Sequence, residues 1–144
     1  MTHYRTTLRN TVQPLLAGAP KVGKRIYSHR VSPSEAPAIN IMTGSDSAKE
    51  EYNTATAEGR EVTLMVQIVV KETDDYMATC DLIAAYVETK ILADLTLGGI
   101  AKHIEYAGTD DEASDELDAD VAQITMLFEV SMRIARGDPN TIVQ

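Results

Sequence analysis

The chain has 144 residues, of which 44% are hydrophobic and 24% charged, a composition typical of one globular domain with its own core. Its formal net charge of −9 disfavours tight binding to duplex DNA, because such binding depends on neutralising phosphates. The single cysteine, Cys80, excludes an internal disulfide and favours a reducing cytoplasm, and no apolar stretch is long enough for a membrane span.

The charges are segregated along the chain. Residues 1–34 contain six basic side chains and no acidic one, whereas the rest of the chain contains seven basic and 22 acidic side chains. The densest run places seven carboxylates between Asp110 and Asp120. Such segregation allows copies of the chain to dock on one another, or allows a basic patch to bind an acidic partner. The alternative is that the basic part is only solvated surface.

The first third of the chain predicts one helix and two strands. Residues 3–17 place apolar side chains on one face at helical spacing, and Pro14 predicts a kink near the end of this helix. Residues 25–31 and 38–42 alternate between apolar and polar side chains and are separated by the break SPSEAP, which predicts two strands. Residues 44–60 are polar without a period, which predicts a long mobile loop or the solvated end of a hairpin.

The next segments continue the alternation of element types. Residues 61–71 have the clearest strand pattern, and residues 73–94 change to a helical period. The expected buried stripe of that helix contains Tyr76, Cys80, Ile83, Val87 and Ile91. Residues 100–108 predict a strand, and the acidic run 109–120 predicts a mobile loop, because like charges oppose a compact turn.

Residues 121–134 predict the last strand, because every even-numbered position in this range is apolar. We expect that face to be buried against the helix at 74–94. The final residues, GDPNTIVQ, are expected to form a polar turn and tail. The predicted order is α-β-β-β-α-β-β, an α+β domain over residues 1–144 in which two helices pack on one face of an antiparallel or mixed sheet.

Searches for chemical motifs give no catalytic residue, no metal site and no cofactor site. GAPKVGKR at 18–25 nearly matches a phosphate-binding loop, but Arg25 replaces the hydroxyl residue that binds Mg²⁺, and the segment leads from helix to strand. The acidic run lacks the glycine of an EF-hand loop. The three histidines belong to three elements and lack metal-ligand spacing: His3, His29 and His103.

Five stretches, taken in chain order, resemble the tail terminator proteins of long-tailed phages, the minor tail protein U family. They are YRTTLRNTVQPLLAGAP, RIYSHRVSPSEAPAINIMTGSD, REVTLMVQIVVKETDD, LADLTLGGIAKHIEYAGTD and ITMLFEVSMRIARGDPNT. The likeness covers nearly the whole chain, although each motif is short and has no chemical specificity. It implies an α+β subunit of a hexameric ring that caps the tail tube, stops its polymerisation and presents the surface that joins the head.

The resemblance also implies the partners and the location. The partners are other copies of the chain, the tail tube protein and the head–tail connector protein, while DNA passes through the lumen without specific binding. The location is the tail end or neck of a virion that is assembled in the host cytoplasm.

Charge complementarity suggests a set of interface residues between copies of the chain: Arg25, Arg30, Asp110, Asp111, Asp115 and Glu116. Two alternatives stay open. The first is that the chain is another neck or tail-tube component of the same fold. The second is that it is a small intracellular enzyme or ligand-binding domain whose site has no recognised motif.

Overall fold

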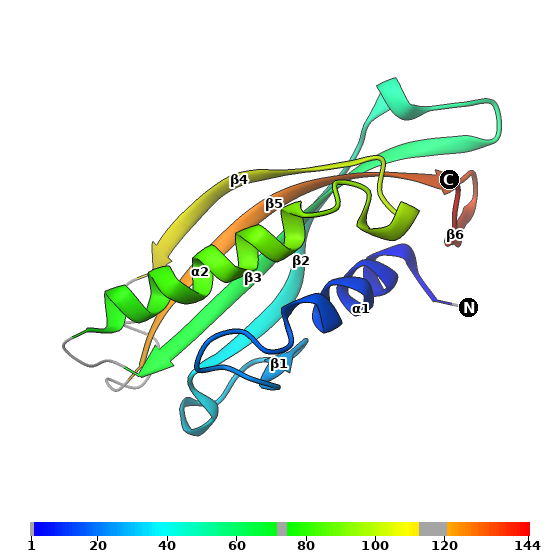
Figure 1. Ribbon diagram of the computed structural model, residues 1–144. Coiled ribbons are helices and arrows are strands. Elements are labelled where there is room, and N and C mark those ends of the chain that lie inside the picture. Colours follow the sequence, from blue (N-terminus) through cyan, green and yellow to red (C-terminus); the bar gives the residue numbers. More distant parts are fainter. Residues whose placement is uncertain (1, 72–74, 113–120) are drawn as a thin grey trace.

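The computed structural model describes residues 2–71, 75–112 and 121–144 and shows two helices over one six-stranded sheet (Figure 1). The helices and strands, in chain order, are α1 (Tyr4–Leu16), β1 (Ile26–Tyr27), β2 (Ala38–Ala48), β3 (Ala57–Lys71), α2 (Tyr76–Leu92), β4 (His103–Glu112), β5 (Val121–Ala135) and β6 (Asp138–Ile142). Short 3-10 turns lie at Pro33–Glu35, Glu50–Tyr52 and Leu97–Gly99.

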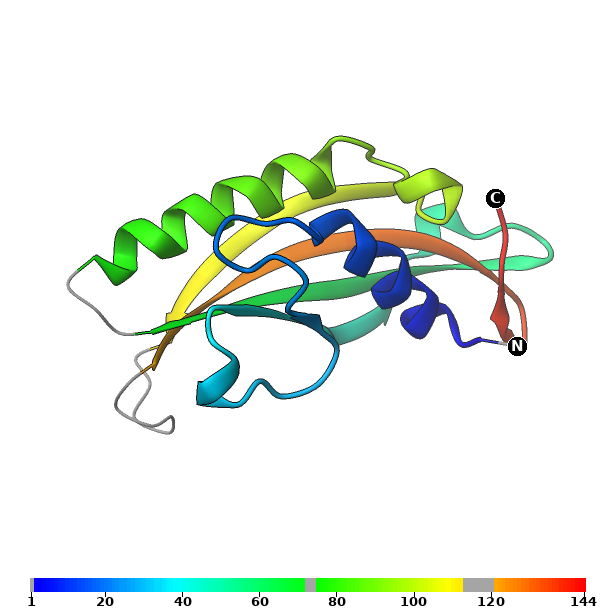
Figure 2. The same ribbon diagram turned by 60° about the horizontal axis from the view of Figure 1, so that its bottom comes forward.

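The sheet is mixed and has the strand order β1-β2-β3-β5-β4, with β6 paired to β5. The β1–β2 pair is parallel and all the other pairs are antiparallel. Both helices lie side by side on the same face of the curved sheet (Figures 1 and 2). The predicted α+β class and the helix placement are therefore confirmed, with β6 as one strand more than expected.

The two central strands, β3 and β5, pair along their whole length, from Ala57 opposite Ala135 to Lys71 opposite Val121. Alternation places the even-numbered residues of both strands toward the helices. In β5 this face includes the fully buried Phe128, and Ala122 and Ile124 at its start are partly buried. The predicted register of the last strand is confirmed.

Each helix buries one stripe of side chains spaced three or four residues apart. The stripe of α1 contains Tyr4, Leu8, Val12 and Leu16, and that of α2 contains Cys80, Ile83, Val87 and Ile91. Tyr76, predicted in the α2 stripe, is only partly buried against the core. Helix α1 continues through Pro14 and ends two residues later, since a proline in the last turn removes only one intrahelical hydrogen bond.

Residues 44–60 form the end of the β2–β3 hairpin, which is the second of the two predicted alternatives. Strand β2 continues to Ala48 and β3 begins at Ala57, with a bulge between Thr43 and Asp46. A backbone hydrogen bond from Lys49 N to Gly59 O, 2.9 Å long, closes the paired region. The polar composition hid these strands because the hairpin end has little core to face.

Three further expectations about element bounds are wrong. The strand predicted at 25–31 is reduced to β1, because the chain leaves the sheet after Tyr27. Residues 109–112 belong to β4 instead of a loop, because they pair with β5; residues 113–120 lie outside the described residues. The expected polar tail forms β6, and Val143 N donates a 2.8 Å hydrogen bond to Arg133 O.

Candidate assembly interface

One edge of the sheet is basic. Strand β1 forms this edge, and four exposed cations lie before and after it, which we call the basic edge: Lys21, Lys24, Arg25 and Arg30. Arg25 is held against its own backbone, since its Nε donates to Pro37 O at 2.8 Å and its Nη2 donates to Lys21 O at 2.5 Å. The short turn through Val22, buried under α1, therefore positions the guanidinium at the surface.

The opposite edge is acidic. Strand β4 forms this edge, and its exposed carboxylates, which we call the acidic edge, are Glu105, Asp110 and Asp111. Asp110 pairs in register with Thr125 of β5 and Asp111 pairs with Ile124, so the backbone of both residues is fixed by the ladder. The carboxylates therefore stand on a rigid strand and not on a loop.

The structure places the four described members of the predicted interface set in two groups within one copy, with Arg25 and Arg30 beside β1 and Asp110 and Asp111 on β4. Three strands, β2, β3 and β5, separate β1 from β4, and the segment after β1 carries Arg30 over the sheet to a groove that is also lined by Val121 and Gln123 of β5. Asp115 and Glu116 lie outside the described residues. Opposite charges on opposite edges suit a head-to-tail contact, in which one edge of a copy meets the other edge of the next.

A groove of about 430 Å³ lies on the sheet face that the helices leave uncovered, which we call the helix-free face. Its lining residues are Ser28, His29, Arg30, Val31, Asn40, Met42, Gln67, Val69, Val121 and Gln123. A small apolar cluster adjoins it, formed by Val31, Ala36, Ala38, Val69 and Val121. The segment after β1 therefore forms a wall over the sheet, and Arg30 belongs to both the groove and the basic edge.

Asn40 is the unusual residue of this groove. Only 2% of its surface is exposed, and its Oδ1 accepts no hydrogen bond from the described residues. The sequence pattern does not indicate that Asn40 is buried, because a polar residue between Ile39 and Ile41 is typical of a strand with one solvated face. In this protein the wall at residues 28–31 covers that face of the strand, and no local sequence pattern predicts this covering.

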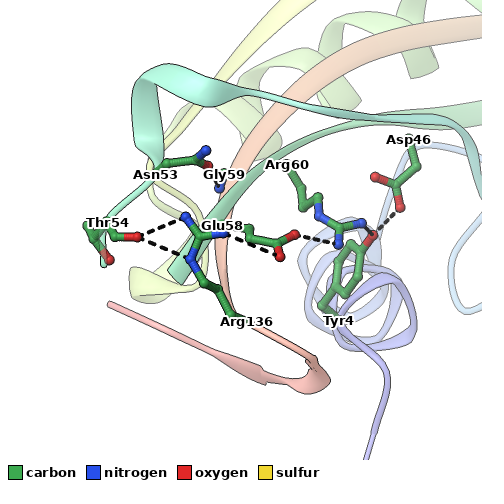
Figure 3. A network of polar contacts seen from close by, with 8 residues as sticks. All are labelled: Tyr4, Asp46, Asn53, Thr54, Glu58, Gly59, Arg60 and Arg136. Atoms are coloured by element: carbon green, nitrogen blue, oxygen red, sulfur yellow. Dashed lines mark hydrogen bonds and ion pairs between the residues drawn. The ribbon is translucent and has the colours of Figure 1, made fainter. Parts of the chain in front are cut away.

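A polar network joins α1, the β2–β3 hairpin and the turn after β5 (Figure 3). The Tyr4 hydroxyl donates to Asp46 and accepts from Arg60 Nη1 at 3.4 Å. Arg60 pairs with Glu58 at 3.0 Å, and the other oxygen of Glu58 lies 3.7 Å from Arg136 Nη1. The network therefore fixes the base of the hairpin to the first residues of α1.

The protonation state of Tyr4 follows from this setting. Burial, the hydrogen bond to Asp46 and the negative charge of Asp46 raise the pKa of Tyr4 to about 12. Tyr4 is therefore a neutral donor at physiological pH, which suits a structural contact and not a nucleophile. The helical spacing of the sequence predicts that Tyr4 is buried, but no sequence pattern indicates its partners, Asp46 and Arg60, which lie 42 and 56 residues away.

The residues considered for chemistry lie apart. Within residues 2–71, 75–112 and 121–144, no three histidine, cysteine or acidic side chains group closely enough to hold a metal ion. Cys80 is buried in the α2 stripe, and burial raises the pKa of its thiol. Neither described helix has the length and apolar character that a membrane span requires.

Comparison with known proteins gives a structural likeness only. The chain matches no protein-family model and no curated protein. Among solved structures, it is similar to a chain from the virion of a native gene transfer agent particle, with a TM-score of 0.59 and 15% sequence identity. The match covers 86% of this chain and 92% of that chain, so the two share a fold over nearly their whole length.

Proposed function

We propose that this chain is a structural subunit of a phage-like virion and acts as a tail terminator: a ring that caps the tail tube, stops its polymerisation and presents the surface for the head. The observation that carries the proposal is the placement of basic and acidic groups on opposite edges of one sheet. The shared fold with a chain of the gene transfer agent virion supports the virion location.

The two edges suggest how such a ring closes. Each copy offers its basic edge to one neighbour and its acidic edge to the other, and rotation about the tube axis returns the last copy to the first. A closed ring has no unpaired edge left, so further growth is possible only along the axis. The resemblance of the sequence to tail terminators supports six copies, with the tail tube protein on one axial side and the head–tail connector protein on the other.

The proposed role requires no catalytic residue and no cofactor. The ring's net negative charge would repel DNA phosphates, so DNA would pass through the lumen without specific binding. A second candidate, a tail-tube or other neck component, is supported by the same virion likeness and the same two edges. The two candidates differ in whether rings of this chain stack on themselves.

Electron microscopy of the purified protein, alone and mixed with tail tubes, tests the proposal. We expect single rings alone and one ring at the end of each tube in the mixture, with tube length fixed after capping. If rings of this chain stack and the stacks continue to lengthen, the chain is a tail-tube component and not a tail terminator. A protein that stays monomeric, both alone at high concentration and with tubes, would overturn the assembly role.

A further inference from the structure

We propose that the groove on the helix-free face is a socket for the acidic segment, residues 109–120, of a second copy of this chain. The inference rests on the proposed head-to-tail ring and specifies the contact between neighbours. It concerns a surface that the two edges alone do not define.

The shape of the groove suits an extended peptide. Its floor is formed by alternate residues of three paired strands, with Asn40 and Met42 from β2, Gln67 and Val69 from β3, and Gln123 from β5. Its volume of about 430 Å³ lies within the range for ligand pockets, about 300–1,000 Å³, and admits a few residues of a chain.

Asn40 provides the first specific contact. Its Oδ1 is buried and lacks a donor within the described part of the chain. Buried acceptors in folded proteins are nearly always paired, so an unpaired one that lines a groove indicates a donor on a bound partner. The backbone N–H of an extended peptide is such a donor, and it is available whatever the side chain.

Arg30 provides the second contact and selects for acidic sequence. It is exposed, and none of the ten lining residues is a carboxylate. A peptide carboxylate next to this guanidinium forms a charge-assisted hydrogen bond. The run 109–120 offers seven such carboxylates, two of which, Asp110 and Asp111, lie exposed on the acidic edge.

The identity of the partner follows from continuity with the ring contact. Arg30 belongs to the basic edge, and a head-to-tail arrangement brings the acidic edge of the next copy against that edge. The acidic edge of this neighbour, with Asp110 and Asp111, then lies next to Arg30 and the groove that it lines. A second copy satisfies Asn40 and Arg30 at every position around the ring.

A mixing experiment tests the socket. One variant is Arg30→Glu; the other, the segment variant, changes Asp110, Asp111, Asp115 and Glu116 to Lys. In each variant alone, the residue at position 30 and the segment that enters the groove have like charges in every contact, so we expect the ring to be lost in sedimentation velocity. An equimolar mixture should restore it, because the two variants alternate around an even-membered ring. Lys90→Glu, an exposed change of equal charge on α2, should keep its ring.

The mixture distinguishes a segment that enters the groove of a second copy from a segment that enters the groove of its own copy. Failure of the mixture, combined with recovery when both sets of changes are made in one chain, means that the segment fills its own groove and overturns the proposal. If the wild-type protein forms no ring, that result contradicts the proposed function. Peptide binding to the groove then tests the socket independently of the ring.

Peptide binding uses the segment variant, whose own segment no longer competes, and a labelled synthetic peptide of residues 109–120. We expect Arg30→Glu and Asn40→Leu, made in that variant, each to weaken binding about tenfold or more in fluorescence anisotropy, as expected for loss of a buried or charge-assisted hydrogen bond. Lys24→Glu, on the same edge but outside the groove, should change the affinity by less than about threefold. Equal effects of the three substitutions, or no binding of the peptide, overturn the socket. Thermal melts establish that each variant is folded.

Discussion

Phe128 occupies the centre of the helix-covered sheet face and has no exposed surface. Its ring packs edge-on against Tyr106 of β4, with ring centroids 5.9 Å apart, and it lies opposite Leu64 of β3. Phe128→Ala should lower the free energy of unfolding by about 3–5 kcal/mol, because it removes buried contacts and leaves a cavity. Denaturant melts measure the loss. A change below about 1 kcal/mol would contradict the role given to this face, and Tyr106→Ala, on a ring 42% exposed, should cost less.

Tyr4 predicts a pH dependence of stability at the alkaline end. Its pKa is raised to about 12 in the folded protein, mainly by burial and by the hydrogen bond to Asp46, whereas a tyrosine in the unfolded chain titrates near 10. The folded state therefore binds more protons between these values. The stabilisation is complete below pH of about 10 and is lost as the pH rises toward 12.

Tyr4→Phe should remove the pH-dependent stabilisation that the Tyr4 hydroxyl provides. We expect the variant to be less stable than wild type at neutral pH by about 1–3 kcal/mol, because Asp46 loses a donor and its Oδ1 already has no partner among the described residues. The difference between the two proteins should shrink as the pH rises from about 10 to about 12. Urea melts at several pH values measure it, with Tyr106→Phe as the control. A difference that stays constant over this range would show that the phenol of Tyr4 does not titrate with folding.

At the scale of elements, the sequence was sufficient where a strand or helix has one face on the core. The alternation in 61–71 and 121–134 and the helical spacing in 73–94 predicted β3, β5 and α2 because their buried faces are continuous. The same logic could not find the end of the β2–β3 hairpin or β6. Both are held mainly by backbone pairing, with one apolar anchor each, Ala57 for the hairpin and Ile142 for β6, which is too few for a periodic pattern. The hairpin end is also held by Arg133, which donates to Tyr52 O at 2.8 Å.

The hairpin end depends on a glycine. A Cβ at Gly59 would lie 2.1 Å from Lys49 O and 2.7 Å from Tyr52 Cβ, so the two chain segments must separate to admit it. Gly59→Ala should therefore destabilise the protein by about 1–3 kcal/mol, the usual cost of overpacking. Thermal unfolding measures the loss, and limited proteolysis should cut first between residues 49 and 56.

The matched control is Gly44→Ala in the same hairpin. Its added Cβ meets the Met65 Sδ at 2.9 Å, but a thioether at the end of a flexible side chain can move. We expect a smaller loss than for Gly59→Ala. Equal losses would mean that the close approach at Lys49 is relieved without breaking the hairpin.

At the scale of the whole molecule, topology converts a charge pattern in the sequence into a charge pattern in space. The basic first quarter and the acidic run were visible from the sequence, but their relative positions were not. The connection from β3 through α2 places β4 beyond β5, so the acidic residues reach the edge opposite to β1. Had β4 paired with β1, the same residues would have neutralised one another within one copy. The sequence therefore predicts which residues form the proposed interface, but only the strand order places the acidic ones at the edge opposite to β1.

A contact between exposed charged edges should weaken with salt. The Debye length falls from about 10 Å at 0.1 M to about 3 Å at 1 M, so an attraction across solvent between Arg25 or Arg30 and Asp110 or Asp111 is largely screened at the higher value. The ring population should therefore fall between these conditions, and Arg25→Glu should lower it at about 0.1 M salt. Lys90→Glu makes the same charge change on α2 and should leave it unchanged.

An apolar interface gives the opposite result, because burial of apolar surface is not weakened by simple salt and does not depend on Arg25. Sedimentation velocity at the two ionic strengths distinguishes the two. A ring that is unchanged by salt and by Arg25→Glu would exclude charge matching as its source of affinity and leave the ring itself in place. The uncovered side chains of α2, above all Met77 and Leu82 with 63% and 50% of their surfaces exposed, would then be the first residues to test as the contact.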